Sequence, residues 1–227
     1  MWSGRMPDNK DLVSTLQKNG RITSQKVADA MDQIDRGIFV PPGEPSYMDH
    51  PVPIGYNATI SAPHMHAICL ELLKDHLQPG MHALDIGAGT GYLTAIFALM
   101  VGDTGRSVGV EHIPELTATA VANVQKSNAA RLLNIGSLSL HTGDGRDGFP
   151  EHAPYDAIHV GAAAPSIPPA LTDQLKPGGR LVIPVGEVFQ ELIVIDKDLK
   201  GELKKSEHLS VRYVPLTDRQ SQLNKKL

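Results

Sequence analysis

The sequence predicts an α/β protein, in which a doubly wound, mainly parallel sheet has helices on both faces and follows a helical extension. Two observations support this prediction. A strand-like apolar run at 83–86 leads into a turn with glycine at alternate positions and then into a helix-like run at 92–101. Strand-like and helix-like patterns keep alternating after it, which is typical of parallel sheets with crossover helices.

The N-terminal segment 1–56 is predicted to be an extension of this fold. Helical periodicity covers 11–18 and resumes in a second helix through Ile34, for which Thr23 or Ser24 offers an N-cap. Five prolines within 39–56 predict an irregular connection. We therefore expect a single domain over the whole chain, with a Rossmann-like core at 57–227.

The core is predicted to begin with a helix whose apolar pattern covers 67–77. Thr59 or Ser61 would provide its N-cap, and Pro63 suits its first turn. A serine at such a position is often only a cap, so the position alone does not separate a structural from a functional role for Ser61.

Further strands and helices follow the glycine turn in alternation. The predicted strands are 106–110, 138–141, 155–160, 180–184, 191–195 and 211–218, with helices at 114–126 and 167–175. The Pro-Gly-Gly segment 177–179 is expected to interrupt the chain before its strand. Pro215 is expected to end the last strand or to keep it at the edge of the sheet.

Composition and charge restrict the classes of function. The 227 residues carry a formal net charge of -4 without a long basic run, which disfavours broad binding to nucleic acid or to an anionic membrane. Cys69 is the single cysteine and can form no disulfide within the chain, which is typical of a reducing compartment. No apolar run approaches membrane-spanning length. His64 and His66 would point away from each other on a helix, so we predict no metal site. We expect a monomer in the cytosol.

The glycine turn differs from two common nucleotide-binding motifs. Gly87, Gly89 and Gly91 alternate, whereas the dinucleotide motif needs its third glycine one position later, where Tyr92 stands. No lysine follows the glycines, as a P-loop requires. Glycine still allows positive φ and close approach of a ligand, and the amides that begin the following helix face that ligand.

Three carboxylates are expected at the same edge of the sheet. Asp85 ends the first core strand, Glu111 ends the second, and Asp144 follows the third. Glu111 could accept hydrogen bonds from a ribose diol, and Asp144 could accept one from adenine N6. Taken singly, Glu111 could equally be an ordinary surface residue, and Asp144 could belong to a turn that binds no ligand. S-adenosylmethionine has an adenosine and a cationic reacting end, so it fits the whole set.

Longer motifs resemble one family of Rossmann-like methyltransferases. The motifs are 58–66, 156–163, 175–181 and 213–218, in that order over nearly the whole chain. They are similar to the signature segments of protein-L-isoaspartate (D-aspartate) O-methyltransferases. The resemblance implies methyl transfer from S-adenosylmethionine to the α-carboxylate of L-isoaspartyl and some D-aspartyl residues in damaged proteins. It implies S-adenosylhomocysteine as product, a role in protein repair and no metal.

The resemblance also implies roles for individual residues. Ser61 and Asp85 take the catalytic positions, where Ser61 orients the acceptor carboxylate and Asp85 orients the donor. The implied cofactor-binding residues are Ala58, Thr59, Ile60, Ser61, His66, Asp85, Gly87, Gly89, Gly91, Glu111, His112, Asp144, Gly145 and Thr217. The implied substrate-binding residues are Thr59, Ser61, His66, Val214, Pro215 and Leu216, the last three in a C-terminal strand that covers the site.

The implied chemistry depends on positioning. A carboxylate is already ionised at neutral pH, so its attack on a sulfonium methyl group needs alignment and exclusion of water and no strong base. Three alternatives stay open: another small-molecule or nucleic-acid methyltransferase with the same donor, an inactive S-adenosylmethionine-binding module, and a dinucleotide oxidoreductase. The segment 159–161 lacks the motif of amine methylation in nucleic acids, and the glycine spacing disfavours the oxidoreductase.

Overall fold

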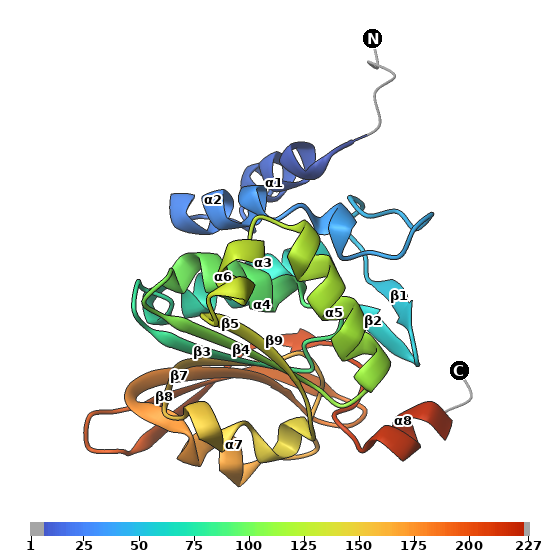
Figure 1. Ribbon diagram of the computed structural model, residues 1–227. Coiled ribbons are helices and arrows are strands. Elements are labelled where there is room, and N and C mark those ends of the chain that lie inside the picture. Colours follow the sequence, from blue (N-terminus) through green and yellow to red (C-terminus); the bar gives the residue numbers. More distant parts are fainter. Residues whose placement is uncertain (1–6, 225–227) are drawn as a thin grey trace.

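A computed structural model describes residues 7–224, which form nine strands and eight α-helices (Figure 1). The strands are β1 Val52–Gly55, β2 Ala58–Ile60, β3 His82–Ile86, β4 Arg106–Glu111, β5 Leu138–Thr142, β6 Tyr155–Val160, β7 Leu175–Val185, β8 Gln190–Lys197 and β9 Leu203–Val211. The helices are α1 Asn9–Lys18, α2 Gln25–Gln33, α3 Pro63–Leu73, α4 Tyr92–Val101, α5 Pro114–Lys126, α6 Ala130–Asn134, α7 Pro169–Asp173 and α8 Arg219–Asn224. The 3-10 turns are η1 Arg36–Ile38, η2 Lys74–His76, η3 Gly145–Asp147 and η4 Pro150–His152.

The main sheet has seven strands in the order β5-β4-β3-β6-β7-β8-β9. The five strands β3, β4, β5, β6 and β7 are parallel, and β8 and β9 add an antiparallel edge. Helices α3 to α6 cover one face, with α1 and α2 stacked outside them, and α7 covers the other (Figure 1). The predicted doubly wound α/β fold with an N-terminal helical extension is confirmed.

Strand β3 lies inside this sheet, between β4 and β6, and packs on both faces. Ala83 belongs to the core shared with the extension, α3 and α4, whereas Leu84 and Ile86 point to the core that includes Leu171 of α7. Because both faces are covered, a ligand can reach the centre of the sheet only at its edges. In open α/β sheets that place is the carboxyl edge of the strands.

Local sequence signals place several element boundaries correctly. Ser24 caps α2, and its hydroxyl accepts the N–H of Val27 at 3.3 Å. Pro63 and Pro114 occupy the first turns of α3 and α5, where the missing N–H costs nothing. The predicted bounds of α4, α5 and β6 match the structure residue for residue.

The expectation that 39–56 is irregular throughout is wrong. Strand β1 pairs antiparallel with β2, and Pro53 lies opposite Thr59. A two-stranded sheet leaves one edge of each strand free, so a proline there need not remove a ladder hydrogen bond. The hairpin turns at Tyr56 and Asn57, whose φ angles are 53° and 56°. The sequence lacks the Asn-Gly pair that normally marks such a turn.

The expected N-cap of α3 is also wrong. Ala62 occupies the cap position and makes no side-chain cap bond, while Thr59 lies inside β2. Ser61 stands one residue too early to cap, so its hydroxyl is not used by the helix. The helix ends at Leu73, and η2 continues the turn where 67–77 had been predicted as one helix.

Three predictions near the C-terminus need correction. Strand β7 continues through the Pro-Gly-Gly segment, with an irregular register against β6 and a positive φ at Gly178. Helix α7 is shorter than predicted, and α6 and α8 were not predicted. The last strand is β9, and residues 212–218 form no strand. Among them only Pro215 makes an isolated bridge, with Ala163, through bonds that the N–H groups of Ala163 and Leu216 donate.

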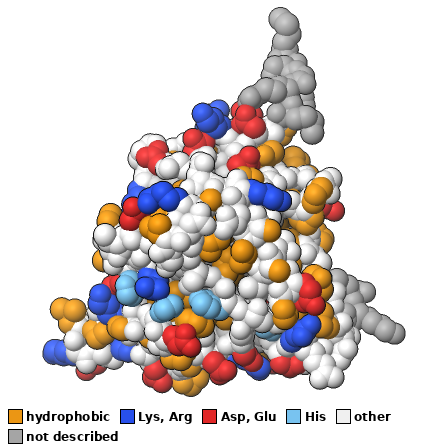
Figure 2. Space-filling view, in the orientation of Figure 1, with side chains coloured by type: hydrophobic (Ala, Val, Ile, Leu, Met, Phe, Trp, Pro, Cys, Tyr) orange, Lys and Arg blue, Asp and Glu red, His pale blue; other side chains and the backbone are white. Residues whose placement is uncertain are grey.

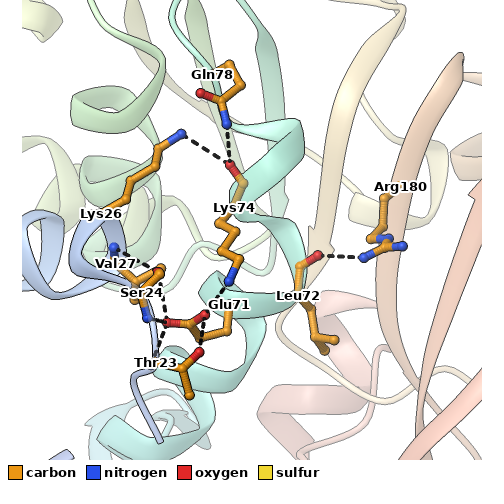
Figure 3. Close-up of polar contacts among 9 residues, drawn as sticks. All are labelled: Thr23, Ser24, Lys26, Val27, Glu71, Leu72, Lys74, Gln78 and Arg180. Carbon is orange, nitrogen blue, oxygen red and sulfur yellow. Dashed lines mark hydrogen bonds and ion pairs between the residues drawn. The ribbon is translucent and has the colours of Figure 1, made fainter. Parts of the chain in front are cut away.

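Polar contacts attach the extension to the second half of α3 (Figure 3). The Glu71 carboxylate accepts the backbone N–H groups of Thr23 at 2.9 Å and Ser24 at 2.8 Å, together with both hydroxyl groups. Lys74 donates to the same carboxylate at 2.9 Å. Burial opposes ionisation of Glu71, but the bonds from Ser24, Lys74 and Thr23 outweigh it and lower its pKa to about 2.

Candidate active site

The glycine turn after β3 is required by both backbone conformation and space. Gly87, Gly89 and Gly91 have φ angles of 73°, 54° and 88°, which disfavour any residue with a side chain. A Cβ atom on Gly91 would lie 3.1 Å from the Cβ of Ala120, and one on Gly89 would lie 3.2 Å from Ile54 Cδ1. The turn therefore leaves a bare backbone cradle at the carboxyl edge of the sheet.

Glu111 joins the end of β4 to this cradle. Its Oε2 accepts the N–H of Gly89 at 3.0 Å, and its Oε1 accepts the N–H of Ile113 at 3.0 Å. The side chain is buried but lines a pocket of about 530 Å³, which we call the first pocket. Each carboxylate oxygen retains a second lone pair, so Glu111 can accept further hydrogen bonds from a ligand.

The first pocket contains most of the residues expected to bind the cofactor. Those that line it are Ala58, Thr59, Gly87, Gly89, Glu111, His112, Gly145 and Thr217, with Val214, Pro215 and Leu216. Asp144 does not line it. Its carboxylate accepts the N–H of Arg146 at 3.0 Å and pairs with the Arg146 guanidinium, which is the main reason that its pKa is lowered. Gly145 has no room for a side chain, because a Cβ would lie 2.4 Å from Ile86.

The C-terminal segment covers the first pocket. The N–H of Ala163 donates to Val214 at 2.8 Å, and the N–H of Leu216 donates back to Ala163 at 2.7 Å. Gln222 of α8 also lines the pocket, with its side-chain oxygen 2.7 Å from His112 Nε2. Sequence reasoning missed Gln222. Its only signal is a polar side chain in a short helix, which is common on any surface.

A second pocket of about 370 Å³ adjoins the first, and Thr59, Gly87 and Gly89 line both. The predicted residues that line it are Thr59, Ile60, Ser61, His66, Asp85, Gly87 and Gly89. Gly91 lines neither pocket and acts as the cap of α4. Thus the structure brings all the predicted site residues except Asp144 and Gly91 to two adjoining pockets.

Asp85 is held by the protein itself. Its Oδ1 lies 2.9 Å from Nδ1 of His159, and its Oδ2 accepts the hydroxyl of Thr94 at 2.6 Å. Burial opposes protonation of His159, but its bonds to Asp85 and to the Cys69 thiol raise its pKa to about 10. The two residues form a buried ion pair behind the glycine turn. His159 was missed as a site residue, although it faces Asp85 directly across β3 and β6.

Two hydroxyl groups beside the second pocket have no partner within the described residues 7–224. They are Thr90 Oγ1 and Tyr92 OH, in side chains that are 4% and 2% exposed. Burial raises the pKa of Tyr92 to about 12, so its hydroxyl keeps its proton. Buried polar groups normally have partners, so these two indicate a polar ligand. The donor set therefore fits the amino-acid end of S-adenosylmethionine.

Ser61 and His66 also line the second pocket, and the centre of the His66 ring lies 5.1 Å from that of the Tyr92 ring. The tail residue Tyr213 lies against Ser61 and Cys69, and burial is the first cause that raises its pKa well above the usual value. His66 is 7% exposed. Burial and then the charge of Arg36 lower the pKa of His66 well below its usual value, so the ring is neutral.

Residues 7–224 contain no group of three or more His, Cys, Asp or Glu side chains arranged to hold a metal ion. None of their helices combines the length and apolar character needed to cross a membrane.

Comparison with known proteins agrees with this geometry. The family Protein-L-isoaspartate(D-aspartate) O-methyltransferase (PCMT) matches residues 7–221. Protein-L-isoaspartate O-methyltransferase 1 of Arabidopsis thaliana is 61% identical over 223 residues, which cover 98% of this chain and 97% of that protein. The protein-L-isoaspartate O-methyltransferase of Caenorhabditis elegans is 46% identical over 226 residues, which cover 99% of each.

A solved structure shows the same fold. It is a putative protein-L-isoaspartate O-methyltransferase from Plasmodium falciparum in complex with S-adenosyl-L-homocysteine. It superposes with a TM-score of 0.86 at 33% identity and covers 93% of this chain and 99% of its own. The chain described here belongs to the protein-L-isoaspartate(D-aspartate) O-methyltransferase family.

Proposed function

We propose that this chain repairs damaged proteins by transferring a methyl group from S-adenosylmethionine to the α-carboxylate of L-isoaspartyl residues, and of some D-aspartyl residues. The observation that carries the proposal is the pair of adjoining pockets at the carboxyl edge of β3, β4 and β6. Glu111 lies in one pocket and Ser61 in the other, with the bare Gly87–Gly89 backbone between them. A donor molecule across the turn would then meet an acceptor carboxylate.

The first pocket would hold the adenosine. Glu111 would accept the ribose hydroxyls with its free lone pairs, as its place after the second core strand suggests. The adenine base and the ribose would be surrounded by His112, Ala58, Gly145 and Thr217. Asp144 would accept from adenine N6 only if its carboxylate were shared with Arg146.

The second pocket would hold the amino-acid end of the donor and the acceptor carboxylate. When bound, S-adenosylmethionine supplies an electrophilic methyl group. Thr90 and Tyr92 would bond to its polar groups. Asp85, paired with His159, fixes the end of β3 under the turn and so orients the donor. Because the pair has little net charge, it repels neither the sulfonium nor the carboxylate.

Ser61 would orient the acceptor carboxylate. Its hydroxyl does not cap α3 but forms a hydrogen bond with Tyr213. Because Tyr213 keeps its proton, its hydroxyl can donate to the Ser61 oxygen and leave the Ser61 proton for the acceptor carboxylate. Thr59 and His66 would complete the polar wall, and Val214, Pro215 and Leu216 would lie along the peptide. Enclosure by this tail would exclude the water that otherwise solvates the carboxylate.

We also propose that the protein acts as one domain and one subunit in the cytosol, without nucleic acid. A net charge of -4 supports the last point, and Figure 2 shows acidic and basic side chains interspersed on the face in view. Cys69 is buried and unpaired, which suits a reducing compartment.

The test is transfer of labelled methyl from S-adenosylmethionine to a peptide with one isoaspartyl residue, with the aspartyl peptide as control. Base-labile label on the isoaspartyl peptide only is the expected result. Binding of S-adenosylhomocysteine without any transfer would instead identify an inactive binding module. Equal labelling of both peptides would contradict the proposed specificity for isoaspartyl over aspartyl residues.

A further inference from the structure

Arg36 of η1 is the largest completely buried side chain of the described residues, and it comes from the extension, outside the sheet. Its guanidinium group reaches three acceptors. Nε donates to the carbonyl oxygen of Ser46 at 3.0 Å, Nη2 donates to that of Ser61 at 2.9 Å, and Nη1 lies 3.2 Å from Nδ1 of His66. The guanidinium carbon also lies 5.6 Å from the centre of the Tyr92 ring.

All three acceptors of this cation are uncharged. Burial of a charge is costly, and buried arginines are normally paired with a carboxylate. Here the bonds go to two carbonyl groups and an imidazole, so the positive charge is not neutralised by direct contact. Its field therefore extends toward Ser61 and His66, which line the second pocket. Such an arrangement favours an anion in that pocket.

Arg36 also determines which nitrogen of His66 carries a proton. A guanidinium group has donors and no acceptor, so Nδ1 of His66 must accept the bond. A neutral imidazole has one donor and one acceptor, and the proton is therefore on Nε2. The ring contributes a hydrogen-bond donor to the pocket that it lines, in the same way as the hydroxyl group of Ser61.

We propose that Arg36 is a positioning residue of the methyl-transfer site. It holds the Nε2–H tautomer of His66 and fixes the Ser61 backbone, so that both side chains donate hydrogen bonds to a bound carboxylate. This inference rests on the proposed function. The carboxylate belongs either to the isoaspartyl acceptor or to the amino-acid end of the donor, and the two sources can be separated by experiment.

The experiment compares Arg36→Met and Arg36→Lys with the control Lys26→Met. Methionine removes the charge and all the donors, while lysine keeps the charge but lacks the fork that reaches three acceptors. Lys26 bonds the extension to the other end of α3, so Lys26→Met loosens the same extension away from the site. A purely structural role of Arg36 predicts that the control and the Arg36 variants behave alike.

Three quantities are measured in each variant. The first is the tautomer of His66, from the ring ¹⁵N chemical shifts, assigned with His66→Gln. The second is the dissociation constant of S-adenosylhomocysteine, and the third is kcat/KM for an isoaspartyl peptide. We expect Arg36→Met to give a mixture of His66 tautomers and to lower kcat/KM by on the order of 100-fold. Lys26→Met should leave all three quantities unchanged.

The kinetic split identifies the carboxylate. A loss confined to kcat/KM for the peptide assigns it to the acceptor, and a matching loss of S-adenosylhomocysteine affinity assigns it to the donor. A folded Arg36→Met that keeps only the Nε2–H tautomer of His66, or whose kcat/KM stays within about threefold of the wild type, would overturn the proposal. If Arg36→Met does not fold, the same criteria apply to Arg36→Lys, for which a loss of at least about tenfold is expected. The tautomer measurement needs no turnover, so it tests Arg36 even if the proposed reaction fails.

Discussion

The two ends of α3 are both bound by the N-terminal extension, but in opposite ways. At the C-terminal end, the Glu71 carboxylate meets Lys74 and the backbone of Thr23 and Ser24, so opposite charges are paired. At the N-terminal end, Arg36 is fully buried and bonds only to uncharged groups. At the first end the opposite charges are in direct contact, whereas the charge of Arg36 is opposed only at a distance, by Asp49, which bonds to His64 instead.

This difference separates stability from function along one helix. The Glu71 contacts satisfy the free N–H groups at the start of α2, which is a task of folding. The Arg36 contacts leave a positive field and a defined histidine tautomer next to a pocket, which folding alone does not require. Changes at the two ends should therefore affect different measurements.

Removal of Glu71 should have the largest effect on stability. Glu71→Ala leaves the N–H groups of Thr23 and Ser24 without their acceptor and Lys74 without its partner. We expect the free energy of unfolding to fall by about 2–3 kcal/mol. Urea denaturation measures the loss. Activity below the unfolding transition should stay within about twofold of the wild type. A tenfold loss of activity in the folded variant would contradict the separation.

Ser61→Ala should show the reverse pattern. Since Ser61 does not cap α3, loss of its hydroxyl should change the free energy of unfolding by less than the ~1 kcal/mol typical of a lost cap. Turnover on the isoaspartyl peptide should fall more than about tenfold, because the acceptor carboxylate loses an orienting bond. S-adenosylhomocysteine affinity should stay within a few-fold. Equal losses of turnover and affinity would exclude the positioning role.

The pH dependence of stability should distinguish the two ends. The pKa of Glu71 is lowered from 4.5 to about 2, so its contribution is complete above pH 4.5 and lost as the pH falls toward 2. The pKa of His66 is lowered well below 6.5, so the folded state loses stability as the pH falls below 6.5, where the unfolded chain binds a proton.

Variants make this comparison measurable. The difference in unfolding free energy between wild type and Glu71→Gln should be constant from pH 7 to 5 and shrink below pH 4.5. The difference between wild type and His66→Gln should already change between pH 6.5 and 5. Urea denaturation at each pH gives both curves. Identical curves for the two variants would show that one coupled network, and not two separate ends, controls the stability of α3.

Much of the fold and of the donor site could be predicted because their signals are local. The alternate glycines at 87, 89 and 91 predict both the end of β3 and the start of α4. Glu111 is the last residue of the next strand, β4. Such signals lie within one strand, turn and helix. Strand β9 carried a weaker signal. Its side chains are mostly exposed and include Lys204 and Lys205, so it lacks the apolar alternation of a half-buried strand.

The missed site residues depend on contacts between distant segments. Arg36 and His66 are 30 positions apart, and Asp85 and His159 are 74 apart. No periodicity links such pairs, and a lone arginine near a proline-rich segment is usually an exposed residue. Ser61 shows the opposite problem, since a serine before a helix is commonly a cap. Only the structure, in which Ala62 occupies the N-cap position of α3, shows that the Ser61 hydroxyl is not a helix cap.

The smallest effect is expected at Lys26, which tests the C-terminal end of α3 without touching Glu71. Its ammonium group donates to the carbonyl oxygens of Lys74 at 3.1 Å and Leu77 at 2.8 Å (Figure 3 shows the first). Both bonds are only partly buried, so water can replace the lost donor. Lys26→Met should therefore cost about 0.5–1.5 kcal/mol of unfolding free energy, measured by urea denaturation, with turnover unchanged. A loss of turnover in this variant would mean that motion at one end of α3 reaches Ser61 at the other, and the helix would then transmit the effect of the extension rather than separate its two roles.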